Sequence, residues 1–162
     1  SLIGLVDTVI MPRIIKAFWE GKLRIIGDGQ NMVDLTSVAN MVQAIERSLT
    51  ADGPALNQAY NITNGEPVKL WESIEEVLSL LGYQLEKKRV PYTVLKWVAH
   101  FMEWKSKMTN FKEPVLTVYG VGTLATSFTM DISKARKLLH YEPEVSTHEA
   151  MKEFATWYAD TL

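Results

Sequence analysis

The chain has 162 residues, 47% hydrophobic and 22% charged, a balance typical of a folded globular protein. Its 17 lysines and arginines stand against 19 aspartates and glutamates, so it has no excess of basic charge for a nucleic-acid backbone, and we expect no nucleic-acid partner. It has no cysteine, which excludes disulfides and thiolate chemistry, and its three histidines lack the spacing of a metal site. No apolar run reaches the roughly 18 residues of a membrane span, and the apolar start has no basic flank, so we expect a cytoplasmic domain without a signal peptide.

The first half of the chain alternates short strands with helices. Strand signals, rich in β-branched and aromatic residues, occur at 23–26, 32–36 and 59–63, and a glycine-containing turn at 27–31 separates the first two. Helical spacing of apolar residues predicts helices over 8–19 and 37–49. Ser37 is expected to cap the second of these, which places five apolar residues on one face: Val38, Met41, Val42, Ile45 and Leu49.

The second half of the chain is richer in helix. The predicted strands are 84–90 and 127–130. Three helices are predicted over 71–81, over 91–107 and, as a short helix, near 115–121. Two more follow: one is capped by Asp131 or Ser133 and ends near 140, and the last is capped by Ser146 or Thr147. The last helix is expected to turn four residues inward: Met151, Phe154, Ala155 and Tyr158. Helices between short strands indicate an α/β class with too few strands for a complete doubly wound sheet.

Two motifs are typical of a dinucleotide-dependent dehydrogenase, a glycine-rich turn and a Tyr-x-x-x-Lys pair. Neither occurs in this chain in the structural context that its chemistry requires. The close glycine pairs at 27–29 and 120–122 have no third glycine three residues on, and the first leads into a strand instead of a helix. Tyr-x-x-x-Lys spacing occurs at 83–87, across a predicted helix end, and at 92–96, where it heads a polar stripe on a helix. We therefore expect no catalytic, cofactor-binding or metal-binding residue in this chain.

The predicted helix over 91–107 has two contrasting sides. One carries a polar stripe of Lys96, His100, Glu103 and Lys107, with Glu103 and Lys107 expected to form a surface ion pair. The other side is widely apolar: Val94, Leu95, Trp97, Val98, Phe101, Met102 and Trp104. Core packing is the leading interpretation of this apolar face. There are two alternatives. The helix could form a lid over an apolar substrate, or residues 92–107 could make peripheral contact with a membrane surface, which the lysines beside the tryptophans would suit.

Three blocks in order resemble the second half of the extended short-chain dehydrogenases/reductases. They are IGDGQNMVDLTSVAN at 26–40, YNITNGEPV at 60–68, and DISKA at 131–135 followed by LHYEP at 139–143. The segment GLVD at 4–7 is similar to the "GPxD" loop of that family, so the resemblance covers essentially the whole chain. It implies the C-terminal part of a Rossmann-like α/β enzyme, and one domain over 1–162.

The resemblance also accounts for the missing motifs. In that family the glycine-rich turn and the catalytic Ser/Thr–Tyr–Lys group precede the "GPxD" loop, so we expect the cofactor-binding half to be absent and the chain to be a fragment of a longer enzyme. The complete enzyme would bind NAD or NADP, and this chain alone would bind neither. Two positions depart from the family pattern, because His140 and Ala150 stand where glycine is usual.

One position indicates the subfamily. Nucleotide-sugar epimerases and dehydratases of this family usually carry a diphosphate-binding arginine where this chain has Val33. The segment around Val33, with an apolar helix opening at Tyr92, instead resembles the 3β-hydroxysteroid and sterol 4α-carboxylate 3-dehydrogenases, which oxidise a 3β-hydroxyl. We therefore expect a small apolar substrate, contacted by four residues: Met11, Val33, Leu35 and Tyr92.

Strand alternation predicts that Asp34 points away from Val33 and Leu35 as a buried hydrogen-bond acceptor, and Asn40 is expected to make a contact at a helix start. Two alternative functions stay open: a nucleotide-sugar epimerase or dehydratase, in which Arg24 or Lys22 would contact the phosphate, and a non-enzymatic binding domain.

The N-terminal apolar residues predict the physical state of the chain. Ile3, Leu5, Val9, Met11 and Ile14 would pack against the absent half in the family. Without it, we expect an exposed apolar patch over 2–15, and either a homodimer or a marginally stable fold.

Overall fold

The computed structural model describes residues 2–3, 10–108 and 118–161, and the structural statements below refer to these. Its helices are α1 (Ile10–Trp19), α2 (Val38–Leu49), α3 (Leu70–Leu80), α4 (Tyr92–Met108), α5 (Val118–Ala125), α6 (Ser133–Leu139) and α7 (Thr147–Thr161), with a 3₁₀ turn, η1 (Gly53–Ala55). Its strands are β1 (Leu2–Ile3), β2 (Ile25–Ile26), β3 (Met32–Val33), β4 (Thr36–Ser37), β5 (Val68–Lys69) and β6 (Arg89–Val90). Helices joined by short strands confirm the α/β class.

The strands form two-stranded ladders. β1 pairs with β4 and β2 with β6, both in parallel, and β3 pairs with β5 antiparallel. On its other side, Val33 of β3 forms a single parallel bridge with Phe128. The turn between β2 and β3 needs glycine at position 29, since φ there is +70° and a Cβ would lie 2.8 Å from Cγ2 of Ile25.

The predicted strands are too long. The strand expected over 32–36 is interrupted, because the backbone N–H of Asp34 donates to the carbonyl of Phe128 while the carbonyl of Leu35 accepts from the N–H of Asn64. The stretches 59–63 and 127–130 form no regular ladder, and 84–90 pairs only at its last two residues. Their backbone groups bond to neighbours far along the chain, which local residue patterns do not reveal.

The starts of α2 and α7 follow local capping chemistry. The hydroxyl of Ser37 accepts from the N–H of Ala39, so the predicted cap of α2 is confirmed. At α7 the alternative between two caps resolves to Ser146. Its N–H donates to the carboxylate of Glu149, whose N–H donates back to the Ser146 hydroxyl, forming a reciprocal capping box.

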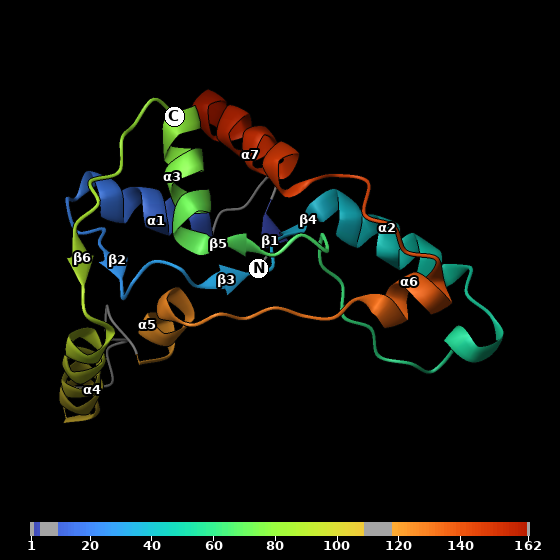
Figure 1. Cartoon of the computed structure of the whole chain (residues 1–162), viewed down its shortest axis with the longest axis horizontal. Helices are drawn as coiled ribbons and strands as arrows, with labels where there is room; N and C mark the ends of the chain where they lie inside the picture. Colours follow the sequence, from blue (N-terminus) through green and yellow to red (C-terminus); the bar gives the residue numbers. More distant parts are fainter. Residues whose placement is uncertain (1, 4–9, 109–117, 162) are drawn as a thin grey trace.

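The apolar core has two parts along an elongated molecule. Figure 1 shows α1, α3 and α7 around the short strands in the middle, with α2, α6 and η1 at one end and α4 at the other. The main cluster packs α1, α3 and α7 together through fully buried Ile15, Ile74, Val77 and Phe154. The second cluster joins α2, η1 and α6 through Ala44, Ala55, Ala135 and Tyr141.

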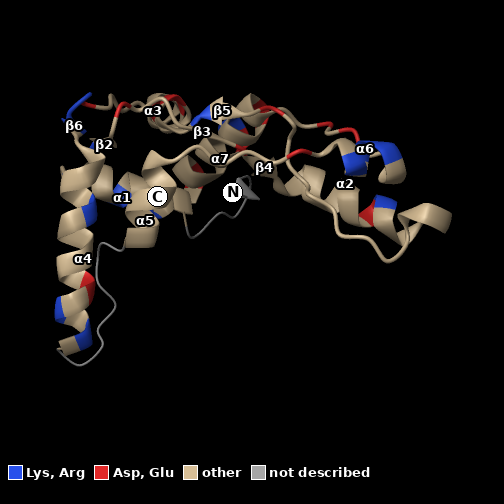
Figure 2. Ribbon diagram, turned by 60° about the horizontal axis from the view of Figure 1, so that its bottom comes forward, with Lys and Arg blue, Asp and Glu red and all other residues tan. Residues whose placement is uncertain are grey.

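Two helices expose the apolar faces that their spacing predicted. On α2 the buried residues are Asn40 and Ala44, whereas Val38, Val42, Ile45 and Leu49 are exposed. On α4 the leading interpretation, core packing of the whole apolar face, is wrong, because four large residues on it are more than half exposed: Val94, Trp97, Phe101 and Trp104. Figure 2 shows α4 projecting from the rest of the molecule. None of the helices that the structure describes is long and apolar enough to cross a membrane.

The exposed apolar patch expected over 2–15 is not found in the described part of this segment, where most apolar side chains are covered. Met11 and Ile15 are buried in the main core, Ile14 packs against it, and Ile10 is exposed. The side chains of Ile3, Leu5 and Val9 lie outside the described residues. The main core therefore already covers most of the inner face of α1.

Candidate substrate cavity

A cavity of about 450 Å³ opens between α1, α3, α5 and α7. Residues 33–35, which run from the last residue of β3, form one wall together with residues 126–128, which lie beside them. The indole N–H of Trp71 on α3 donates to the carbonyl of Leu124 at 3.1 Å, which ties α5 to α3 along another wall. The cavity therefore lies where elements far apart in the sequence meet.

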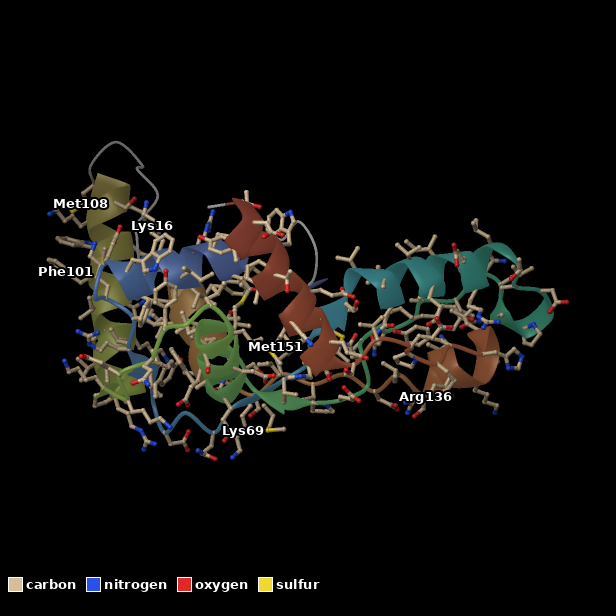
Figure 3. The ribbon with its side chains drawn as sticks, turned by 90° about the horizontal axis from the view of Figure 1, so that it is seen from above. Lys16, Lys69, Phe101, Met108, Arg136 and Met151 are labelled. Carbon is tan, nitrogen blue, oxygen red and sulfur yellow. The ribbon has the colours of Figure 1, made fainter. Side chains whose placement is uncertain are left out.

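The cavity wall is mainly apolar. Its large apolar side chains are Ile10, Met11, Ile14, Val33, Leu35, Leu70, Ile74, Val77, Leu124, Phe128 and Met151. Figure 3 shows Met151 on α7, close to α3. Apolar walls of this kind suit an apolar ligand, because each Å² of apolar surface buried on binding contributes roughly 25 cal/mol of favourable free energy.

Four of the polar side chains that border the cavity are hydrogen-bonded within the protein. The hydroxyls of Ser73 and Thr123 donate to carbonyls one helical turn back, and that of Ser127 accepts from the N–H of Met32. The carboxylate of Asp34 accepts from the N–H of Met130, as expected for a buried acceptor. Asp34 also borders the cavity, between Val33 and Leu35.

No lysine, arginine or histidine is among the described residues that line the cavity. The two cations named as alternative phosphate contacts are engaged elsewhere. Lys22 pairs with the carboxylate of Glu20 at 2.7 Å, and the guanidinium of Arg24 donates to the carbonyl of Leu23 at 2.7 Å. Among the described residues, the walls thus provide mainly apolar contact and no cationic partner for a diphosphate.

Three of the four predicted substrate contacts come together. Met11, Val33 and Leu35 all line the cavity, whereas Tyr92 does not and packs against the main core at the start of α4. The ammonium of Lys96 lies 5.9 Å from the centre of the Tyr92 ring, so this pair stacks on the helix surface away from the cavity. The predicted role of Tyr92 rested on its position at the start of an apolar helix, which does not determine the direction of a side chain.

Sequence reasoning missed most of the wall. Met151 is predicted as an inward residue of the last helix, Leu70 and Ile74 have no predicted role, and Tyr119 belongs to the short helix expected near 115–121. Phe128 is the wall residue that the sequence pattern could have identified. It lies in a predicted strand, and pairing that strand beside 32–36 would have placed it next to Val33.

No family model matches the sequence. The chain is 37% identical over 94% of its length to 3β-hydroxysteroid-dehydrogenase/decarboxylase isoform 1 of Arabidopsis thaliana, covering 37% of that protein. It is 28% identical, again over 94% of its length, to human sterol-4-alpha-carboxylate 3-dehydrogenase, decarboxylating, covering 43% of it. The chain thus spans less than half the length of these curated relatives.

Solved structures agree on the fold. UDP-glucuronic acid 4-epimerase from Bacillus cereus in complex with NAD matches 99% of this chain with a TM-score of 0.65 at 19% identity, over 42% of the epimerase chain. The structure titled gox2253 matches 99% of this chain with a TM-score of 0.70 at 18% identity, over 47% of that chain. The chain is thus similar in sequence to part of the sterol and hydroxysteroid 3-dehydrogenases, and it shares its fold with part of the extended short-chain dehydrogenases/reductases.

Proposed function

We propose that this chain provides the substrate side of an NAD(P)-dependent dehydrogenase that oxidises the 3β-hydroxyl of a sterol-like or other apolar secondary alcohol. The observation that carries the proposal is the apolar cavity with Val33 in its wall, where the family resemblance implies an arginine in nucleotide-sugar enzymes. The names of the sequence relatives, a 3β-hydroxysteroid dehydrogenase/decarboxylase and a sterol carboxylate dehydrogenase, support the same substrate class.

In this proposal the residues of the chain bind and orient the substrate. Met11, Val33 and Leu35 contact its apolar body, and Phe128 extends the same wall beside Val33. The apolar walls exclude water from the reacting carbon, which favours hydride transfer over side reactions. Bound to the complete enzyme, NAD or NADP would supply the hydride acceptor, and a cofactor-binding half would supply the group that takes the hydroxyl proton.

We expect this chain alone to bind neither dinucleotide, since the two glycine pairs, 27–29 and 120–122, lack the pattern that holds a pyrophosphate. Calorimetric titration of the chain with NADH and NADPH tests this, and a stoichiometric complex with either would contradict it. A chain that binds sterol but belongs to a protein without dehydrogenase activity would support the binding-domain alternative.

Direct ligand binding distinguishes the apolar substrate from a nucleotide sugar. We expect a fluorescent sterol with a free 3β-hydroxyl to bind the chain and UDP-glucose not to bind. Val33→Arg should weaken sterol binding by about tenfold or more, because it places a guanidinium in an apolar wall. Val42→Arg is the matched control, since Val42 is 47% exposed on α2 and does not line the cavity. Tighter binding of UDP-glucose, or equal losses in both variants, would overturn the proposal.

A further inference from the structure

The second glycine of the GVG sequence at 120–122 lies on the cavity wall. It belongs to α5, and three residues of this helix, Tyr119, Gly122 and Thr123, line the cavity. At 100° per residue they share an arc of about 100°, so one side of α5 faces the cavity. Gly122 leaves a stretch of bare backbone on that side, beside the side chains of Tyr119 and Thr123.

Nothing in the described part of the chain requires glycine at position 122. Glycine inside a helix is less favourable than alanine, because it loses more backbone freedom on folding. At Gly29 this cost has a local reason, since a positive φ and the side chain of Ile25 both exclude a Cβ. At Gly122 φ is not positive, and within the described residues no atom beyond its own helix backbone and chain neighbours lies within 4 Å of an ideal Cβ. The space above Gly122 is therefore open, and it belongs to the cavity.

The backbone at Gly122 suits contact with an apolar surface. Its carbonyl accepts from the N–H of Thr126 at 2.9 Å, so this oxygen needs no partner from a ligand. An apolar group can lie on it without leaving a backbone acceptor unpaired. Tyr119, one helical turn before Gly122, and Phe128 also line the cavity and are 84% and 65% exposed, which marks the open side of the cavity.

We propose that Gly122 is a specificity-determining residue, on which the flat face of a rigid fused-ring substrate lies in direct contact with the backbone of α5. This role depends on the proposed function of the cavity as the substrate site. A fused-ring skeleton cannot bend around an added methyl group, whereas a flexible alkyl chain can. Because a closely packed contact responds to a single methyl group, position 122 selects between these two kinds of apolar alcohol.

Gly122→Ala should change stability and binding in opposite directions. We expect it to raise the Tm of the chain by about 2–4 °C, because alanine is the better helix former. It should weaken binding of dehydroergosterol, a fluorescent sterol with a free 3β-hydroxyl, by about tenfold, since the methyl group occupies the space of the ring. Binding of hexadecan-2-ol, a flexible secondary alcohol, should weaken by less than about threefold. Tryptophan fluorescence of the chain follows both ligands, and circular dichroism gives the Tm.

Ser48→Ala on α2 is the matched control, a substitution by alanine inside a helix away from the cavity. Ser48 is exposed and does not line the cavity, so both affinities should stay within about twofold of the wild type. Equal sterol affinities of the wild type and Gly122→Ala, or equal losses for the two ligands, would overturn the role of Gly122 and leave the sterol site intact. A lower Tm of Gly122→Ala would also overturn it, by showing that the fold itself requires this glycine. A folded wild-type chain that binds no sterol would overturn both this role and the proposed function.

Discussion

The side-chain N–H of Asn40 donates to the side-chain oxygen of Asn64 at 2.7 Å, in a site where both amides are buried. The same N–H₂ group of Asn40 donates to the carbonyl of Val145, and its oxygen accepts from the N–H groups of Glu144 and Val145. Asn64 in turn accepts from the N–H of Ser37 and donates to the hydroxyl of Thr147. Asn40, in the first turn of α2, thus bonds to the residues directly before the start of α7, as expected for a contact at a helix start, and Asn64 contacts the start of α2.

Asn40→Asp should destabilise the fold by roughly 3 kcal/mol, because a carboxylate would face two oxygens at the positions where the amide now donates. We expect a single cooperative urea transition for the wild type, since these bonds connect the two core clusters. Asn61→Asp is the control. Its amide makes one bond on the exposed surface, to the carbonyl of Asp131, so it should cost less than about 1 kcal/mol. Equal losses in the two variants would argue against the role of the network.

Local chemistry made the helices of this chain predictable, and distant contacts made the strands unpredictable. The Ser146–Glu149 capping box lies within four consecutive residues, and it determines where α7 begins. The bridge from Val33 to Phe128 joins residues 95 positions apart, and it decides both where β3 ends and what lines the cavity. The exposed apolar face of α4 has the same spacing as the buried face of a core helix, so periodicity could not distinguish burial from exposure.

His140→Gly should stabilise the fold by about 1 kcal/mol. His140 ends α6 with φ 52° and ψ 38°, a left-handed conformation that a Cβ disfavours and glycine adopts freely. His140→Ala keeps the Cβ and should leave the free energy of unfolding within about 0.5 kcal/mol of the wild type. Urea denaturation measures both variants. A gain in the alanine variant equal to that in the glycine variant would show that the imidazole, and not the backbone conformation, is the source of the strain.

Alkaline titration should reveal the burial of Tyr141. Its ring is fully buried, its hydroxyl donates to the carbonyl of Thr63 at 2.9 Å, and burial raises the pKa of Tyr141 from 10.0 to about 12. Because the folded state holds this proton more tightly than the unfolded state, the contribution to stability is complete below pH 10 and is lost as the pH rises toward 12.

Tyr141→Phe isolates this contribution from the lysines that titrate in the same range. It should cost about 1–2 kcal/mol at neutral pH, through the lost hydrogen bond and the unpaired Thr63 carbonyl, and the difference from the wild type should shrink above pH 10. Chemical denaturation at several pH values measures the two stability curves. A constant difference across this range would show that the phenol titrates normally.

Glu103→Ala should loosen α5 and with it one wall of the cavity. The Glu103 carboxylate accepts from the N–H of Val118, the first residue of α5, and so satisfies a donor that has no partner within the helix. The loss should cost about 1 kcal/mol locally and speed hydrogen exchange of the α5 amides roughly fivefold. Glu103→Gln keeps a carbonyl acceptor and should cost about half as much, because the favourable charge at the helix start is lost while the bond remains. Lys107→Ala, on the same side of α4, should leave exchange in α5 unchanged. Equal acceleration in the lysine variant would mean that general fraying of α4, and not the capping bond, controls this wall.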